Sequence, residues 1–600
     1  MKELQSLNKY FLKYKWHLLG GILFVTISNL FGIFPAQLTR NALDVVAANI
    51  DTYRLTGGFE VSGDVYKSLV YNILLFGVLV ISMALAKGVF MFLMRQTIIV
   101  MSRHIEYDMK NEIFDHYQKL GLDFFNRNNT GDLMNRISED VGRVRMYVGP
   151  AIMYSINMVV MFVLVVWAMY SVNARLATYV LIPLPLMSLL VYYVHDRINK
   201  KSEAVQEQLS SLSTFVQEAF SGIRLIKAYA REKQYQKAYK DQTEKYSDLS
   251  MELVKVNSMF MPTLLLLVGV STILTIYIGG LEVISGNITV GNIAEFVIYV
   301  NMLTWPVASL GWVISIIQRA AASQQRINEF LNEAPSIKNG QTHCSKISGH
   351  IQFSNVTLQY EEGRTPALKD VSFEIFPGES IGIIGRTGSG KSSVVNALLR
   401  LADPVNGKIS IDGVDLKELD LVSYRKRMGV VPQDVFLFSD TIKENIAFGV
   451  DHAVRQDEVE TAAKQAVVYE NIQGFPNGFD TMVGERGITL SGGQKQRVSI
   501  ARAIIRQPDL LIFDDCLSAV DTITEEKILS NLKLIMEGRT TLVISHRISA
   551  VKACSRILVL EDGCLVEIGT HDELVSSKGL YAQLYEIQLA DHDESPEALR

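Results

Sequence analysis

Six apolar stretches in the first half of the chain most constrain what it can fold into. A helix needs about 20 mainly apolar residues to cross the hydrocarbon core of a bilayer. The stretches cover approximately residues 18–35, 69–93, 147–170, 174–194, 259–279 and 290–317. Because the backbone in lipid must satisfy its own hydrogen bonds, each stretch is expected to be helical. We therefore predict an α-helical membrane domain with six transmembrane helices.

The distribution of lysine and arginine predicts the orientation of these spans. Both residue types are frequent before the first span and in the linkers 95–145 and 197–255, and scarce in the short linkers. Positively charged segments stay on the cytoplasmic side, so both termini and both long linkers are expected in the cytoplasm of a multi-pass protein of the cell membrane. Leu4, Leu7 and Phe11, interleaved with lysines, predict a helix on the inner leaflet.

The two long linkers and Lys87 are the other features of the membrane half that predict function. Both long linkers carry apolar residues at helical spacing, which predicts helices that leave the bilayer and dock through patches around 124–133 and 215–229. Lys87 stands out in spans that are otherwise almost free of charge, and an ionisable residue there suggests a functional role. Two interpretations stay open: ligand contact, or a lysine near the cytoplasmic end of its helix that reaches the interface.

The second half contains a phosphate-binding loop. A polar linker, 327–349, precedes 381-IGIIGRTGSGKSS-393, which matches Gly-x4-Gly-Lys-Ser between a β-like run and a helical run. The glycines let backbone N–H groups surround phosphates, Lys391 reaches the β and γ oxygens, and the Ser392 hydroxyl suits Mg²⁺. The predicted nucleotide-binding residues are Gly385, Arg386, Thr387, Gly388, Ser389, Gly390, Lys391, Ser392 and Ser393.

Asp514 is a candidate for the metal. It ends the apolar run 510-LLIF-513, where a carboxylate can hold Mg²⁺ directly or through water. The alternative is a helix N-cap, which the phosphate loop upstream makes the weaker interpretation.

The segment 490-LSGGQKQR-497 resembles the signature of ATP-binding cassette (ABC) proteins. The resemblance covers essentially the whole chain, which looks like an exporter-type half-transporter. It is similar to subunits of bacterial heterodimeric multidrug exporters and to the lipid A flippase family. The resemblance implies a membrane domain over 1–326, the linker 327–349, an α/β P-loop ATPase domain of ABC type over 350–586 in the cytoplasm, and an acidic tail over 587–600.

The resemblance also implies roles for residues outside the phosphate loop. Tyr360 is expected to stack on adenine, Gln433 in 430-VVPQDVFLF-438 to reach Mg²⁺ and the attacking water, and His546 to act as the switch histidine. The implied Mg²⁺ ligands are Ser392, Gln433 and Asp514. The segment 481-TMVGERG-487 corresponds to the loop that contacts the membrane domain.

The signature is expected to serve a second cassette. Consecutive glycines at a helix start present N–H groups and a positive dipole end, which suits a γ-phosphate. By the family pattern that phosphate is bound by the opposite cassette, so one copy of the chain completes no site and must dimerise. The residues expected to contact the opposite nucleotide are Ser491, Gly492, Gly493, Gln494 and, in 518-SAVD-521, Asp521.

Asp515 departs from the family pattern. Fully active members carry glutamate after the Mg²⁺ aspartate, to position and deprotonate the attacking water. The aspartate carboxylate lies one C–C bond, about 1.5 Å, closer to its own backbone. A misplacement of about 1 Å can cost about 10²-fold in rate. Asp515, His546 and Gln433 are therefore the catalytic candidates of a slow site, and a heterodimer with a glutamate-bearing partner is favoured over a homodimer.

The expected function is ATP- and Mg²⁺-dependent export or flipping of hydrophobic or amphipathic compounds, drugs or lipids. Lys87 adds the expectation of an anionic substrate group. Two alternatives are a homodimeric flippase of lipid or lipid A type and an ATP-gated regulator or channel. The formal net charge of −5 indicates no nucleic-acid partner.

Overall fold

The computed structural model describes residues 2–55, 63–360, 365–484, 490–516 and 530–593. The chain divides into two compact units. Unit 1 comprises residues 1–118 and 131–333, and unit 2 comprises residues 119–130 and 334–600.

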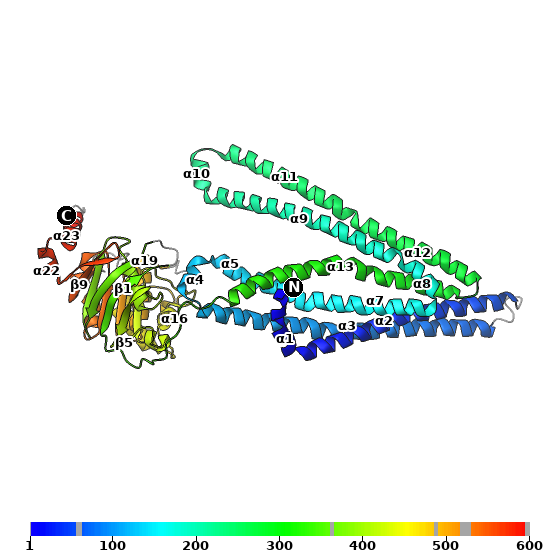
Figure 1. The fold of residues 1–600 in the computed structure, drawn as a ribbon, viewed down its shortest axis with the longest axis horizontal. Coiled ribbons are helices and arrows are strands. Elements are labelled where there is room, and N and C mark those ends of the chain that lie inside the picture. Colours follow the sequence, from blue (N-terminus) through cyan, green and yellow to red (C-terminus); the bar gives the residue numbers. More distant parts are fainter. Residues whose placement is uncertain (1, 56–62, 361–364, 485–489, 517–529, 594–600) are drawn as a thin grey trace. The chain divides into compact units, whose positions relative to one another are not determined.

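Unit 1 is helical throughout its described residues (Figure 1). Its long helices are α2 (Lys15–Leu55), α3 (Gly63–Lys119), α7 (Ile152–Val172), α9 (Pro183–Ser221), α11 (Glu232–Ser258), α12 (Phe260–Ile284) and α13 (Val290–Leu331). Shorter segments connect them: η1 (Lys2–Leu7), α1 (Asn8–Lys13), α5 (Thr130–Asn135), η2 (Arg136–Asp140), α6 (Val141–Met146), η3 (Tyr147–Ala151), α8 (Ala174–Leu181) and α10 (Ile223–Ala228).

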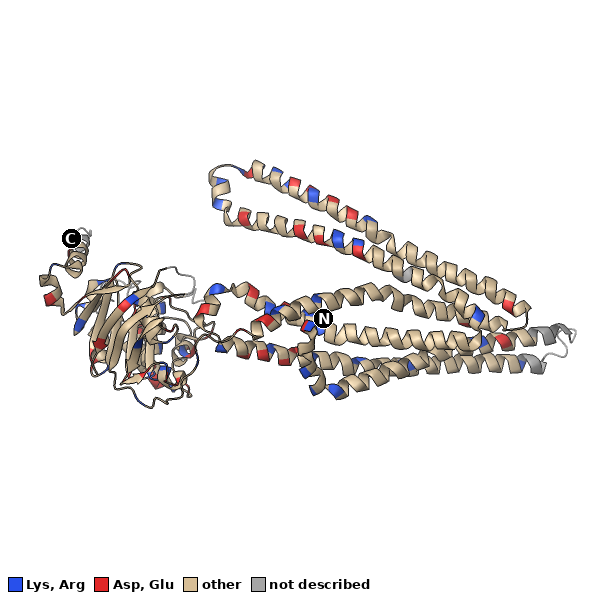
Figure 2. Cartoon of the chain, in the orientation of Figure 1, with Lys and Arg blue, Asp and Glu red and all other residues tan. Residues whose placement is uncertain are grey.

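Six helical stretches of the described residues are long and apolar enough to cross a membrane, which confirms the predicted six spans. They cover Lys15–Asn49, Lys67–Lys119, Thr130–Val172, Ala174–Ser221, Glu232–Ile284 and Val290–Leu331. Charged residues are sparse along the apolar parts of these helices and frequent on their extensions, most visibly on α9 and α11 near α10 (Figure 2). The helices therefore continue well beyond the length a bilayer requires.

Local sequence explains where the spans begin. Thr289 and Asn292 form a reciprocal capping box at the start of α13, and the side chain of Asn173 caps α8 by accepting from the N–H of Leu176. The helix α13 continues through Pro306. Side chains of α2, α7, α8, α9, α12 and α13 share one apolar core, which includes Ile33, Val165, Leu176, Phe296 and Leu303.

Two carboxylates lie buried near the ends of spans, which sequence patterning did not predict. Glu295 of α13 is fully buried and accepts hydrogen bonds from Arg40 of α2 (3.3 Å) and from Tyr299 (2.8 Å). Glu282 of α12 is 4% exposed and pairs with Arg175 (3.1 Å). Lys87 is thus not the sole charged residue in the span helices. The two buried carboxylates are tolerated because each is paired with an arginine.

The N-terminal segment packs on the protein rather than presenting its predicted stripe to lipid. Leu7 is fully buried and Leu4 is 8% exposed. Two side chains of α13 hold the segment in place: Asn328 donates to the carbonyl of Glu3 (3.0 Å), and Gln324 donates to the hydroxyl of Ser6 (3.1 Å).

The helices α9 and α11 pack along each other as a hairpin closed by α10 (Figure 1). None of the side chains of α11 is buried. Around α10 the predicted apolar patch is exposed: Phe220 and Tyr229 are 72% and 74% exposed. Within unit 1 this end of the hairpin thus offers an uncovered apolar surface.

Unit 2 contains two sheets. A six-stranded sheet has the order β10-β9-β3-β8-β7-β6, parallel except for β10. A four-stranded antiparallel sheet has the order β2-β1-β4-β5. The strands are β1 (Ile351–Leu358), β2 (Leu368–Ile375), β3 (Ser380–Gly385), β4 (Asn406–Ile411), β5 (Val414–Asp415), β6 (Met428–Val431), β7 (Leu510–Asp514), β8 (Thr540–Ile544), β9 (Arg556–Glu561) and β10 (Cys564–Gly569).

Helices surround these sheets. They are α14 (Lys391–Leu398), α15 (Leu421–Arg425), α16 (Ile442–Ala447), α17 (Gln456–Gln465), α18 (Tyr469–Gln473), η4 (Gly478–Asp480), α19 (Gly492–Ile504), α21 (Ile548–Val551), α22 (His571–Ser576) and α23 (Leu580–Asp593). Near-continuous apolar strands such as β3 and β7 are typical of a parallel sheet covered on both faces.

The helix α4 (Leu122–Arg127) belongs to unit 2, although its sequence lies in the first linker of the membrane half. Phe124 is 5% exposed, and Ser336 donates a hydrogen bond to Asp123 (2.9 Å). Residues 119–130 of the first linker therefore belong to unit 2, whereas the rest of this linker belongs to unit 1. Docking through the patch around 124–133 stays a prediction.

Candidate nucleotide-binding site

The phosphate loop connects the buried strand β3 to the start of α14. Gly388 and Gly390 have φ values of +83° and +95°, in the region that favours glycine. A Cβ atom at Gly390 would lie 2.4 Å from the carbonyl oxygen of Ala367, and one at Gly385 would lie 2.2 Å from that of Leu560. The loop thus requires glycine at the positions where its backbone would approach phosphates.

Lys391 and Ser392 begin α14 within the loop. Lys391 donates to the carbonyl oxygens of Gly385 and Arg386, at 2.8 Å each, so its ammonium lies inside the turn of the loop. Burial lowers the pKa of Lys391, and the nearby Asp515 and Asp514 partly offset this effect. Such a partly desolvated cation gains from an anionic ligand.

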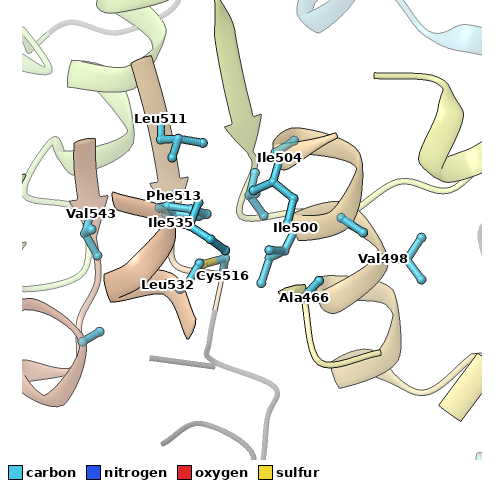
Figure 3. Packing of buried hydrophobic residues seen from close by; sticks show 14 of the residues in the cluster. Ala466, Val498, Ile500, Ile504, Leu511, Phe513, Cys516, Leu532, Ile535 and Val543 are labelled. Carbon is cyan, nitrogen blue, oxygen red and sulfur yellow. The ribbon is translucent and has the colours of Figure 1, made fainter. Parts of the chain in front are cut away.

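Asp514 ends β7 beside the loop and is 6% exposed. Ser392 donates to its carboxylate (3.3 Å), yet burial raises the pKa of Asp514 above its usual value. Leu511 and Phe513 of β7 pack with Ile500 and Ile504 of α19 (Figure 3). This core fixes the end of the strand, and with it the carboxylate.

The side chains present fit a magnesium–nucleotide complex. Ser392 and Asp514 offer two oxygen ligands, and the buried hydroxyl of Ser389 has no hydrogen-bond partner in the structure. No group of three or more His, Cys, Asp or Glu side chains able to hold a metal occurs among the described residues. Mg²⁺ typically takes one or two protein oxygens and completes its shell with phosphate oxygens and water, which this arrangement permits. Gln433, the third implied ligand, is exposed just after β6, the neighbour of β7.

Asp515 and His546 lie in contact at the ends of β7 and β8. The Asp515 carboxylate is 2.8 Å from Nδ1 of His546 and accepts from the hydroxyl of Ser545 at 3.4 Å. Its backbone has a φ of +46° and donates to the carbonyl of Ile544. Aspartate tolerates this left-handed conformation better than most residues. The two predicted catalytic groups are therefore adjacent, with the aspartate directed towards the histidine.

Gln588 of α23 is a site residue that sequence reasoning missed. Its side chain donates to the carbonyl of His546 (2.7 Å) and accepts from the N–H of Ile548 (2.8 Å). It holds both ends of the short segment that carries the histidine, from a helix 42 residues away in sequence. No motif marks it, because the contact depends only on tertiary packing.

Tyr360, the expected adenine-stacking residue, is fixed onto α14. Its hydroxyl donates to Ser393 (3.3 Å) and accepts from Asn396 (2.9 Å). Asn396 was not predicted as a site residue. Its place one turn after Ser392 lets it hold the aromatic ring beside the phosphate loop.

The signature residues begin α19. Ser491 is the N-cap: its hydroxyl accepts from the N–H of Gln494, whose side chain accepts from the N–H of Ser491. Gly492 and Gly493 form the first turn. The predicted Asp521 and residues 485–487 of the loop before the signature lie outside the described residues.

The structure thus brings together the phosphate loop, Ser392, Asp514, Asp515 and His546 around one end of a parallel sheet. Lys391 and the loop can hold phosphates, and the two carboxylates can hold a metal and a water. The signature residues of the same chain are hydrogen-bonded to one another at a different helix start.

Comparison with known proteins agrees with this geometry. The family model described as the ABC transporter transmembrane region matches residues 18–307, and the one described as ABC transporter matches residues 368–518. The probable multidrug resistance ABC transporter ATP-binding/permease protein YheI of Bacillus subtilis (strain 168) is 33% identical over 98% of this chain and 97% of its own length. The multidrug resistance-like ATP-binding protein MdlA of Escherichia coli (strain K12) is 36% identical over 80% of this chain and 83% of its own.

A solved structure gives the same result for the fold. A bacterial Atm1-family ABC exporter with ATP bound superposes with a TM-score of 0.76 at 26% identity, over 96% of this chain and 98% of that one. Six membrane-crossing helices followed by an ATP-binding cassette in one chain are the organisation of a half-transporter. The chain belongs to the ABC transporters of the exporter type, a family of multi-pass membrane proteins that couple ATP hydrolysis to transport.

Proposed function

We propose that this chain is one subunit of a heterodimeric exporter that moves hydrophobic or amphipathic compounds out of the cytoplasm across the cell membrane. Its own phosphate loop would hold ATP with Mg²⁺ and hydrolyse it slowly, while its signature serves the partner's site. The observation that carries this proposal is the contact of the short Asp515 carboxylate with His546, at the position where we expect the family's glutamate.

The chemistry of hydrolysis explains why one methylene matters. Water attacks the γ-phosphorus, the bond between that phosphorus and the β–γ bridging oxygen breaks, and the water proton passes to a nearby base. A base must lie within hydrogen-bond reach of the proton it accepts. Asp515 is held back by its shorter side chain and by its contacts with His546 and Ser545, so turnover at this site should be slow.

Binding should survive, because it depends on other groups. The glycine-rich loop, Lys391 and Asp514 have the arrangement that phosphates and Mg²⁺ require. Mg²⁺ would neutralise charge on the phosphate oxygens when bound. Gln433 and His546 would position the water and the γ-phosphate.

The need for a second chain is supported by the helices as well. The apolar surface around α10 is uncovered within unit 1, with Leu225 and Tyr229 largely exposed. An apolar helix of this kind is suited to docking on a cassette of the partner subunit, and closure of the paired cassettes on ATP would move the membrane helices through it. Both termini and both cassettes would lie in the cytoplasm.

The test is to compare ATP hydrolysis by the purified chain alone and together with a half-transporter encoded beside it. We expect low hydrolysis by the chain alone and drug- or lipid-stimulated hydrolysis by the pair. In the pair, Asp515→Asn should change the hydrolysis rate little, whereas replacement of the partner's glutamate by glutamine should abolish hydrolysis. Rapid hydrolysis by the chain alone would instead support a homodimer that uses Asp515 at both sites.

A further inference from the structure

A cluster of polar side chains lies in the middle of the membrane unit, where α2, α3 and α7 meet. Asn29 of α2 donates to Asn157 of α7 (3.0 Å), and Ser28 of α2 donates to the backbone carbonyl of Lys87 of α3 (3.2 Å). Asn29 and Ser28 are 4% and 5% exposed. Buried polar groups of this kind are costly in a span and are usually retained for a function.

The positions along each helix place this cluster deep in the apolar region. On α2, Asn29 lies 14 residues after Lys15 and 11 before Arg40, or about 21 Å and about 16 Å at the helical rise. Asn157 of α7 lies 12 residues after Arg145 of α6, about 18 Å if the rise is helical throughout. Two helices thus place the cluster far from the nearest charged residue on either side.

The side chain of Lys87 extends along α2 past Ser28 and away from the nearer charged end of α3. A methyl group built at Gly32 of α2 would lie 3.3 Å from Lys87 Nζ, so the ammonium packs against the α2 backbone one turn beyond Ser28. Side chains of a helix lean towards its N-terminus, which for Lys87 is the direction opposite to Arg95. Arg95 is 8 residues, about 12 Å, further along. The structure therefore argues against the lysine reaching back to the cytoplasmic interface.

Within the described part of the chain the Lys87 ammonium has no anionic partner. Residues 68–94 of α3 and 152–172 of α7 contain no Asp or Glu. On α2 the nearest acid, Asp44, is 12 residues from Gly32 and is bonded to Thr289 and Gly291. By contrast, the buried Glu295 and Glu282 each have an arginine. An ammonium group with three hydrogen-bond donors and no acidic partner in the chain favours the binding of an anion from outside it.

The surroundings of Lys87 suit a ligand with an apolar body. Phe90, one turn along α3, stacks on Phe31 of α2 with ring centroids 5.7 Å apart. None of the most apolar 18-residue window of α3 is buried within the described chain. Within one copy of the chain, a ligand can therefore reach α3 laterally while its headgroup meets the ammonium.

We propose that Lys87, whose ammonium packs against α2 at Gly32, binds the carboxylate, sulfonate or phosphate headgroup of an anionic amphiphile within the membrane. This rests on the proposed export function and specifies its substrate class. The ammonium supplies the charge and the hydrogen-bond donors, and Phe31 and Phe90 contact the apolar body.

The test uses the full-length chain, with any half-transporter that co-purifies, in phosphatidylcholine nanodiscs. The probes are a fluorescent NBD-labelled dodecanoate and its uncharged methyl ester. Wild type should bind the carboxylate at least tenfold more tightly than the ester, since hydrogen bonds to charged groups are the stronger ones. Lys87→Ala should bind both probes equally, and Lys87→Arg should keep the preference and report a folded protein.

The matched control is Arg95→Gln, which removes one positive charge from the same helix outside the cluster and should leave the preference intact. Competition with phosphatidylglycerol separates the sources of the ligand: displacement of the carboxylate probe identifies a lipid headgroup, and no displacement identifies a free amphiphile. A preference that persists in Lys87→Ala, or is missing in wild type, overturns the proposal. ATP-driven transport of an uncharged amphiphile, measured separately, shows whether the export function holds regardless.

Discussion

The buried pair between Arg40 and Glu295 allows a quantitative prediction about the membrane unit. Glu295 is fully buried and accepts from Arg40 (3.3 Å), from Asn292 (3.2 Å) and from Tyr299 (2.8 Å). Glu295→Ala leaves three donors without their acceptor, one of them charged. Breaking a buried ion pair from one side costs about 3–5 kcal/mol. The Arg40 side chain is 30% exposed, so solvation recovers part of this and we expect about 3 kcal/mol.

The assay is thermal unfolding of the purified protein in nanodiscs. Glu295→Ala should lower the unfolding midpoint by several degrees, and Glu295→Gln, which keeps an acceptor, by less. The control is Glu329→Ala on the same helix, an exposed site where changes stay within about 0.5 kcal/mol. The double variant Arg40→Met with Glu295→Leu should be more stable than Glu295→Ala, because no buried charge is left unpaired. Equal midpoints for Glu295→Ala and Glu329→Ala would refute the reasoning.

Three further predictions concern the nucleotide site. Gln588→Ala removes two hydrogen bonds from the His546 segment. Because each bond contributes about 1 kcal/mol, amide hydrogen exchange there should rise about thirtyfold, and unchanged exchange would remove Gln588 from the site. Tyr360→Ala should weaken ATP binding at least fivefold through lost stacking, worth about 1–3 kcal/mol. Tyr360→Phe, which loses only the hydroxyl contacts to Ser393 and Asn396, should weaken it less; equal weakening by the two variants, in a titration with a fluorescent ATP analogue, would show that stacking is irrelevant. Burial raises the pKa of Asp514, and Mg²⁺ binds its ionised carboxylate. On acidification, Mg²⁺-dependent ATP affinity should therefore fall at a higher pH than an aspartate with an ordinary pKa would give. Asp514→Asn should abolish this pH dependence of the affinity.

Local patterns explain what the sequence predicted well. Six apolar stretches suffice to predict six spans, because a helix in lipid depends on its own composition. The phosphate loop and the strand ending at Asp514 are contiguous motifs, and the structure brings them together with Asp515 and His546 around one sheet end.

The features that the sequence did not predict depend on contacts between segments far apart in the chain. Arg40 and Glu295 are 255 residues apart, and nothing in either span marks the other as its partner. Gln588 of α23 likewise bonds to His546 from 42 residues away, and no local pattern marks this contact. Leu4 and Leu7 read as a lipid-facing stripe, because amphipathic patterning does not distinguish lipid from a protein neighbour.

The nucleotide held at this chain's own phosphate loop tests the central claim most directly. The paired complex is given 8-azido-ATP labelled on either the α- or the γ-phosphate, crosslinked after many turnovers, and separated into its two chains. On this chain the γ-label should remain nearly equal to the α-label, because the proposed slow hydrolysis at Asp515 would leave most of the bound ATP intact. On the partner the γ-label should be lost. Asp515→Glu should convert this chain to the partner's behaviour, with a rate increase of about 10²-fold. Loss of the γ-label from the wild-type chain as fast as from its partner would contradict the account.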